Sequence, residues 1–189
     1  MQKLSLPYVA HSNHVNTTTL ASPDPFGDLD KIHEQTEESA VTEEVVRHNM
    51  HEVMRCSLSI DALMATFISK FFEPKIETRR TLFDDWIVHS SAVTYKTKFD
   101  ILVAAVKSEQ KLSEKIDLKK IDEHFMRVMM FRNAFAHGKL MRDEPGGSFT
   151  IHHFRGQPEQ HDLDEKRFKK LENSCRAVFD NVRALIESL

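Results

Sequence analysis

The sequence has few cysteines and no long apolar segment. Its only cysteines are Cys56 and Cys175, without a Cys-x-x-Cys motif, which excludes a disulfide-dense framework and favours a reducing compartment. No apolar run reaches the roughly 20 residues of a transmembrane helix. The first residues carry a single Lys3 and soon turn polar, unlike a signal peptide. We therefore expect a cytoplasmic chain that does not enter a membrane.

Glycine is also scarce, and none of the five glycines belongs to a phosphate-binding loop or a dinucleotide fingerprint. The motifs Gly-x-Ser-x-Gly and His-Glu-x-x-His are missing as well. Nucleotide triphosphatases, triad hydrolases and zinc proteases therefore lose support. The formal net charge of −3 excludes a strongly basic nucleic-acid binder, so binding of a polyanion would need a local basic patch.

The chain contains enough apolar residues for the core of one domain, and most of them recur at helical spacing. Residues 1–35 are rich in Ser, Thr, Asn and Pro without a period, which predicts a flexible N-terminal arm, although the partial alternation of Leu4, Leu6 and Tyr8 leaves a short docked segment open. Residues 36–189 favour an all-α fold, a bundle of about five helices with a small β-hairpin before the last helix.

Each predicted element has a recognisable start or stop signal. The long first helix begins near residue 36 and ends before Pro74, and Asp164 is the predicted N-cap of the last helix. The other predicted elements are helices over residues 77–89, 96–107 and 118–137, a polar connector over 112–118, a turn over 143–147, and strands over 148–154 and 160–163. His152 and His153 fall on opposite faces of the first strand, so together they make a poor metal pair, although either could assist substrate binding.

The stretch 131–139 combines the most unusual side chains. It ends a helical apolar stripe formed by Ile121, Phe125, Val128 and Met129. Arg132 continues this stripe, and a guanidinium that faces a core is costly unless a partner pairs with it. Asn133 and His137 are four residues apart, so on a helix they share a face and can touch. Gly138 is predicted to end the helix. Arg132, Asn133 and His137 therefore form a candidate site.

Arg132-Asn133, followed after three residues by His137, resembles the Arg-x4–6-His signature of HEPN domains (higher eukaryotes and prokaryotes nucleotide-binding). Small Ala134 and Ala136, the glycine after the histidine and the position at the end of an amphipathic helix fit the same resemblance. The motif covers six residues, and the broad helical pattern fits from about Glu37 onward. HEPN domains are helical bundles, and many are metal-independent ribonucleases of toxin–antitoxin and phage-defence systems.

The resemblance implies an endoribonuclease with RNA as its substrate, no cofactor and no metal, acting as a homodimer with a composite site. It further implies a toxin or defence role, with an antitoxin or other neutralising protein as partner. Chemically, an imidazole supplies proton transfer near neutral pH and a guanidinium stabilises charge on phosphoryl oxygens while a ribose 2′-hydroxyl attacks. The catalytic candidates are Arg132, Asn133 and His137, and the substrate-binding candidates are Lys139, Arg142, Lys166 and Arg167.

One geometric difficulty leaves alternatives open. Five residues along an ideal helix separate Arg132 from His137 by about 140°. Either an unwound helix end or a two-fold dimer could bring the two side chains together. The structural alternative has Arg132 bonding a loop carbonyl and His137 capping the helix. The functional alternatives are a catalytically silent HEPN-like module that binds nucleotide, RNA or a protein, and, with less support, a helical transcription regulator.

Overall fold

The computed structural model describes residues 1–9, 37–73, 77, 81, 83–88, 90, 92–142, 148–154 and 156–189, with the side chains of residues 37–41 and 86 excepted. The fold is mainly helical, as predicted, with one small antiparallel sheet. Its helices are α1 (Glu37–Phe72), α3 (Tyr95–Ser108), α4 (Gln110–Ser113), α5 (Leu118–His137), α6 (Glu165–Ile186) and the short π-helix η1 (Asp84–Val88). None of the helices in these ranges combines the length and apolar character that crossing a membrane requires.

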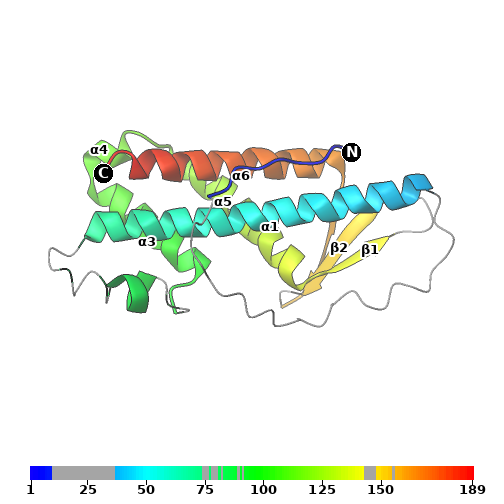
Figure 1. Ribbon diagram of the computed structural model, residues 1–189, viewed down its shortest axis with the longest axis horizontal. Helices are drawn as coiled ribbons and strands as arrows, with labels where there is room; N and C mark the ends of the chain where they lie inside the picture. Colours follow the sequence, from blue (N-terminus) through cyan, green and yellow to red (C-terminus); the bar gives the residue numbers. More distant parts are fainter. Residues whose placement is uncertain are drawn as a thin grey trace.

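The two longest helices, α1 and α6, run side by side along the molecule, and α5 packs against both (Figure 1). The hydrophobic core lies between these helices and α3. An aromatic column forms part of it: the ring of Phe125 on α5 lies 3.8 Å from that of Phe99 and 4.9 Å from that of Tyr95, both on α3. Stacked aromatic pairs bury large areas in a defined geometry, so this column fixes α3 against α5.

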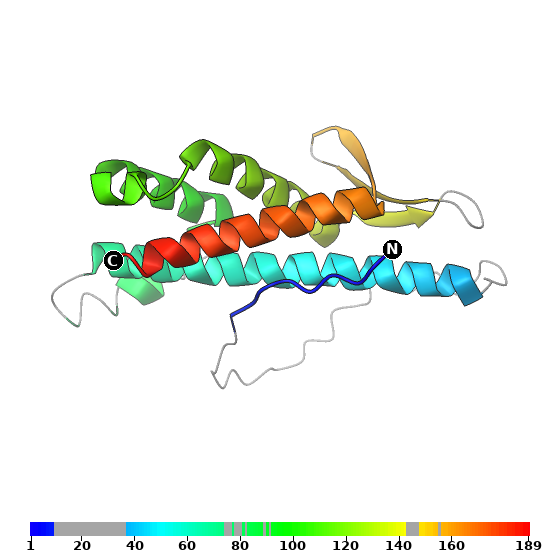
Figure 2. The same cartoon turned by 90° about the horizontal axis from the view of Figure 1, so that it is seen from above.

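The sheet lies at the end of the bundle where α5 ends and α6 begins (Figure 2). Its strands are β1 (Lys139–Arg142), β2 (Phe149–Phe154) and β3 (Pro158–Asp162), paired antiparallel in the order β1-β2-β3. The predicted hairpin corresponds to β2 and β3, but the expectation of only two strands is wrong because β1 adds a third. Whether a short segment forms a strand depends on the strand beside it. The four residues of β1 do not alternate between apolar and polar, so the sequence alone gives no sign of this strand.

The ends of the helices confirm two predicted signals. The Asp164 carboxylate accepts a hydrogen bond of 2.6 Å from the backbone N–H of Arg167, as an N-cap does. Gly138 ends α5, with its N–H donating to the Ala134 carbonyl at 2.7 Å. Its φ is −90°, so left-handed backbone is not the reason for glycine here. A Cβ at this position would lie 2.4 Å from the Ala134 oxygen and 2.8 Å from Cγ1 of Ile151, so glycine allows β2 to approach the end of α5.

Other predicted elements differ in detail or lie outside the described residues. The connector predicted over 112–118 begins inside the one-turn helix α4, because Leu112 is buried and ties this segment to the core. Residues 78–80, 82 and 89 of the helix predicted over 77–89 lie outside the described residues, as do Pro74 and the turn over 143–147; the described part of that helix ends in η1.

Within the arm predicted for residues 1–35, residues 1–9 form the docked segment left open above, and residues 10–35 lie outside the described part. The segment follows α1 and α6 in both views (Figures 1 and 2). Asn49 on α1 holds it from a fully buried position, because its Oδ1 accepts from the N–H of Leu4 at 2.7 Å and its Nδ2 donates to the Gln2 carbonyl at 3.0 Å. A single side chain thus satisfies two backbone groups of the segment.

We expect Asn49→Ala to lower the free energy of unfolding by about 1–3 kcal/mol, because it leaves partly buried backbone groups of Leu4 and Gln2 without partners. Limited proteolysis should then remove residues 1–9 faster than in the wild type. Lys3→Ala is the matched control, because it deletes an ion pair between two exposed side chains, Lys3 (51% exposed) and Glu44 (68% exposed). This variant should show no measurable change in the free energy of unfolding. Equal protease resistance of the Asn49 variant and the wild type would contradict this anchoring role.

Candidate functional site

Arg132 is half-buried on α5, close to where the helix ends. Its guanidinium carbon lies 5.1 Å from the centre of the Tyr95 ring, and its NH1 donates to Oδ1 of Asn133 at 3.4 Å. Its Nε is buried and has no hydrogen-bond partner, and no carboxylate of the described residues forms an ion pair with the guanidinium. Arg132 is therefore a half-buried cation that an aromatic ring and an amide hold in place without neutralising it.

Tyr95 lies on α3, next to an ion pair that joins α3 to α1. Lys98 on α3 is buried and forms an ion pair of 2.8 Å with Asp61 on α1. Burial raises the pKa of the Tyr95 hydroxyl well above its usual value, and Asp61 acts in the same direction, whereas Arg132 opposes the shift. The tyrosine is thus a neutral phenol, and Lys98 already engages the Asp61 carboxylate. Neither Tyr95 nor Asp61 therefore supplies a free negative charge to Arg132.

His137 is the last residue of α5 and is exposed. Within the described part of the chain, its ring makes no hydrogen bond, so none joins it to Asn133. Asn133 instead turns toward its neighbour Arg132. The helix remains regular through His137, so the angular separation of about 140° from Arg132 stays as the sequence predicts.

The structural alternative for the motif is also not seen among the described residues. The bond that closes α5 comes from the backbone of Gly138 rather than from the His137 ring. The guanidinium of Arg132 makes no hydrogen bond with a loop carbonyl. Neither side chain therefore has a structural role in ending the helix.

The four predicted substrate-binding cations lie on β1 and at the start of α6. Lys139 and Lys166 are exposed, whereas Arg142 and Arg167 are half-buried. The guanidinium of Arg142 lies 5.3 Å from the Phe149 ring, and that of Arg167 lies 5.8 Å from the Phe131 ring. Because β1 and α6 meet at the end of α5 (Figure 2), these cations share one end of the molecule with His137. The guanidinium groups of Arg132 and Arg167, however, lie over different aromatic rings, those of Tyr95 and Phe131.

Sequence reasoning missed several polar partners. Asp61, Tyr95 and Lys98 come from positions far from Arg132 in the chain, and no local spacing connects them. A second polar cluster joins α5 to α6: the buried hydroxyl of Ser174 lies 3.1 Å from Nδ1 of His124 and accepts from NH1 of Arg127 at 2.8 Å. The three-residue spacing of His124 and Arg127 was the available signal, because it places both side chains on one helix face.

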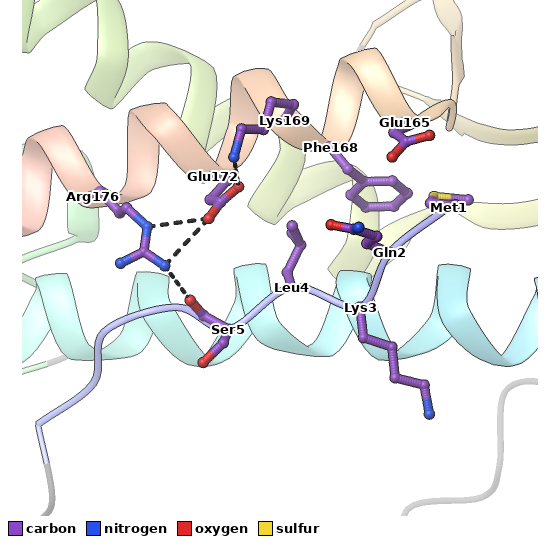
Figure 3. Close-up of a pocket in the computed structure, with 10 residues that line it drawn as sticks. All are labelled: Met1, Gln2, Lys3, Leu4, Ser5, Glu165, Phe168, Lys169, Glu172 and Arg176. Atoms are coloured by element: carbon purple, nitrogen blue, oxygen red, sulfur yellow. Dashed lines mark hydrogen bonds and ion pairs between the residues drawn. The ribbon is translucent and has the colours of Figure 1, made fainter.

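A pocket of about 240 Å³ lies between the N-terminal segment and α6 (Figure 3). Its basic residues are already paired: Lys169 and Arg176 both bind the Glu172 carboxylate, and Arg176 also donates to the carbonyl of Ser5. The hydrogen bond from Lys169 is the largest cause that lowers the pKa of Glu172. No predicted site residue lines this pocket, and Lys169 and Arg176 already have a carboxylate partner.

The two adjacent histidines of β2 lie on opposite faces of the strand, as predicted. His152 is exposed and contacts the Thr150 hydroxyl, whereas His153 is buried. On its buried face, His153 meets Glu159 and His161 of β3, the group of described side chains that could hold a metal ion. Burial is the main cause that lowers the pKa of His161, and it leaves the ring neutral near pH 7 with a free lone pair.

Similarity to known proteins adds nothing to this picture. The site is defined by the half-buried Arg132, its partners Tyr95 and Asn133, and the exposed His137 at the helix end. No family model, no curated protein and no solved structure matches this chain.

Proposed function

We propose that the protein is an endoribonuclease of the HEPN type, which cleaves RNA without a metal through attack of a ribose 2′-hydroxyl on the adjacent phosphate. The observation that carries this proposal is the state of Arg132. A half-buried guanidinium without a carboxylate partner is unfavourable on its own, and a bound phosphate would supply the missing negative charge.

Arg132 is the group that stabilises charge in this mechanism. The Tyr95 ring and the Asn133 amide restrict its guanidinium, so little reorganisation is needed when charge develops on the phosphoryl oxygens. Because the amide oxygen accepts from the guanidinium, we assign Asn133 to positioning Arg132. This role replaces the predicted support of His137.

His137 is the group that moves the proton. Its exposed ring at the helix end is free to reach a bound RNA strand, and imidazole is suited to accept a proton from a ribose hydroxyl. The nucleophile belongs to the substrate and lies beside its phosphorus, so the reaction needs positioning more than activation by an ion. The cations Lys139 and Lys166 are placed to contact the flanking backbone phosphates.

The regular helix end favours a homodimer in this proposal. Since α5 is not unwound before His137, one chain presents Arg132 and His137 on different faces of the helix. A two-fold axis at the end of α5 would place the histidine of one chain near the arginine of its partner. One face of α5 is available for this contact, because its residues at helical spacing are exposed or half-buried: Met126, Met130, Asn133 and His137.

The test is incubation of the purified chain with mixed RNA in excess EDTA. We expect cleavage to persist and the products to carry 2′,3′-cyclic phosphate and 5′-hydroxyl ends, because water does not take part in the first step. Cleavage that depends absolutely on Mg²⁺ or Zn²⁺, in a chain that stays folded in EDTA, would contradict the mechanism. RNA binding without any cleavage would identify the silent HEPN-like module instead. A toxin or defence role with a neutralising partner becomes worth testing once cleavage is observed.

A further inference from the structure

Three potential metal ligands converge on the buried face of the β2–β3 hairpin. His153 on β2 is the direct antiparallel partner of Glu159 on β3, and His161 follows two residues after Glu159. Residues two apart on a strand, and residues directly opposite each other, point to the same face of a sheet. One ligand atom of each side chain lies within 4.8 Å of the other two. Residues that the sequence separates by up to eight positions thus meet at one point.

The imidazoles at this point lack partners. His153 is only 9% exposed, and both of its ring nitrogens are buried without a hydrogen bond, as is Nε2 of His161. The Glu159 carboxylate oxygen lies 3.6 Å from Nε2 of His153 and 3.5 Å from Nε2 of His161, at or beyond the limit of a hydrogen bond. Buried polar atoms without partners are unfavourable, so the Nε2 atoms of His153 and His161, which both lie near the Glu159 carboxylate, point to a missing ligand.

Two of the three ligand–ligand distances are close to those around a small cation. In a tetrahedral site with bonds of about 2.1 Å, ligand atoms lie about 3.4 Å apart. The two nitrogen–oxygen distances of 3.6 and 3.5 Å differ from this value by about 0.2 Å or less. The distance between the two imidazole nitrogens is at most 4.8 Å, so it must shorten by at most about 1.4 Å. His161 can make this movement, because its side chain is less enclosed than that of His153.

The chemical types of the three ligands indicate which metal ion would bind. Two imidazoles and one carboxylate suit a divalent first-row transition metal such as Zn²⁺, whereas Mg²⁺ and Ca²⁺ prefer oxygen ligands alone. We propose that His153, Glu159 and His161 bind one divalent transition-metal ion of the Zn²⁺ class, with water as a fourth ligand on the solvent-exposed side of Glu159. The charged group that approaches from α6 is Arg167, whose guanidinium lies over Phe131. The Glu159 carboxylate supplies a negative charge that offsets the positive charge of Arg167.

The ion would join β2 to β3 beside the helix that carries the candidate site. The His161 ring packs 5.2 Å from the ring of Phe131, which precedes Arg132 on α5. Binding would therefore restrict the β2–β3 hairpin next to the end of α5 and stabilise the folded chain. Arg132 and His137 are not ligands, so the ion takes no part in the proposed cleavage chemistry, and Zn²⁺ binding can be measured separately from RNA cleavage.

The experiment is a calorimetric titration of the chelator-treated full chain with ZnCl₂, supported by thermal melts with and without the ion. We expect one Zn²⁺ per chain and a higher melting temperature when Zn²⁺ is present. Glu159→Gln and His161→Ala should each weaken binding by at least about tenfold, because each removes one of three ligands. The matched control is His152→Ala, which removes an exposed histidine from the opposite face of β2 and should bind as the wild type does.

The variants also separate loss of a ligand from loss of the fold. His161→Ala opens a half-buried position, so its metal-free melting temperature must be measured beside its affinity. Glu159→Gln keeps the size of a half-buried side chain and should fold normally. Weakened binding in a folded Glu159→Gln variant supports the site. Absence of Zn²⁺ binding by the wild type at tens of micromolar, or wild-type affinity in both ligand variants, would overturn it.

Discussion

His137→Ala is expected to lower the rate of RNA cleavage by about 10²–10⁴-fold, the usual contribution of a positioned general acid or base. The side chain is exposed at the end of α5 and makes no hydrogen bond within the described part of the chain, so its removal should leave the melting temperature unchanged. The measurement is single-turnover cleavage of a short RNA, with the melting temperature recorded for the same preparation.

A matched control is His51→Ala, which removes an exposed histidine from α1, outside the candidate site. It should cleave RNA at the wild-type rate. Cleavage by the His137 variant that equals this control would remove His137 from the mechanism. A variant that melts at a much lower temperature would instead show that His137 stabilises the helix end.

The second large effect is expected from Arg132→Lys, which keeps the positive charge but loses the planar guanidinium. We expect turnover to fall by about 10²–10³-fold, as when one preorganised donor to a developing oxyanion is removed. RNA affinity should change little, because the charge that attracts phosphate remains. Cleavage rates under single-turnover conditions and binding by fluorescence anisotropy separate these two effects.

Arg127→Lys provides the same substitution on the same helix, where the guanidinium binds Ser174 at the α5–α6 contact. It should not reduce turnover of the folded chain. If both lysine variants lose activity equally, the effect comes from the packing of α5 rather than from chemistry at Arg132.

Mixing two inactive variants tests whether the site is shared between chains. Arg132→Ala and His137→Ala chains that exchange subunits form heterodimers with one intact arginine–histidine pair. Activity should then return to about one quarter of the wild-type value, because half of the dimers are mixed and each has one working site. Sedimentation must confirm the dimer first. A wild-type chain that is monomeric and fully active would contradict a shared site.

Local signals in the sequence were sufficient for the long helices of the fold. The apolar stripe that ends at Arg132 predicted α5, Asp164 predicted the start of α6, and Gly138 predicted the end of α5, because helix spacing and capping depend on residues within a few positions of one another. The same local spacing identified Arg132 and His137 as candidates and predicted their separation around the helix. These features needed no knowledge of distant partners.

Only the tertiary structure decided which groups meet. The ring under Arg132 belongs to Tyr95 on another helix, and the four residues of β1 become a strand only beside β2. His152 and His153 were predicted to make a poor metal pair, and only the antiparallel register shows that Glu159 lies opposite His153. Such pairings join residues from separate elements, so the periodicity of residues within one segment does not predict them. They are settled by the packing of whole elements, which brings distant side chains to one face and leaves Arg132 without a carboxylate partner among the described residues.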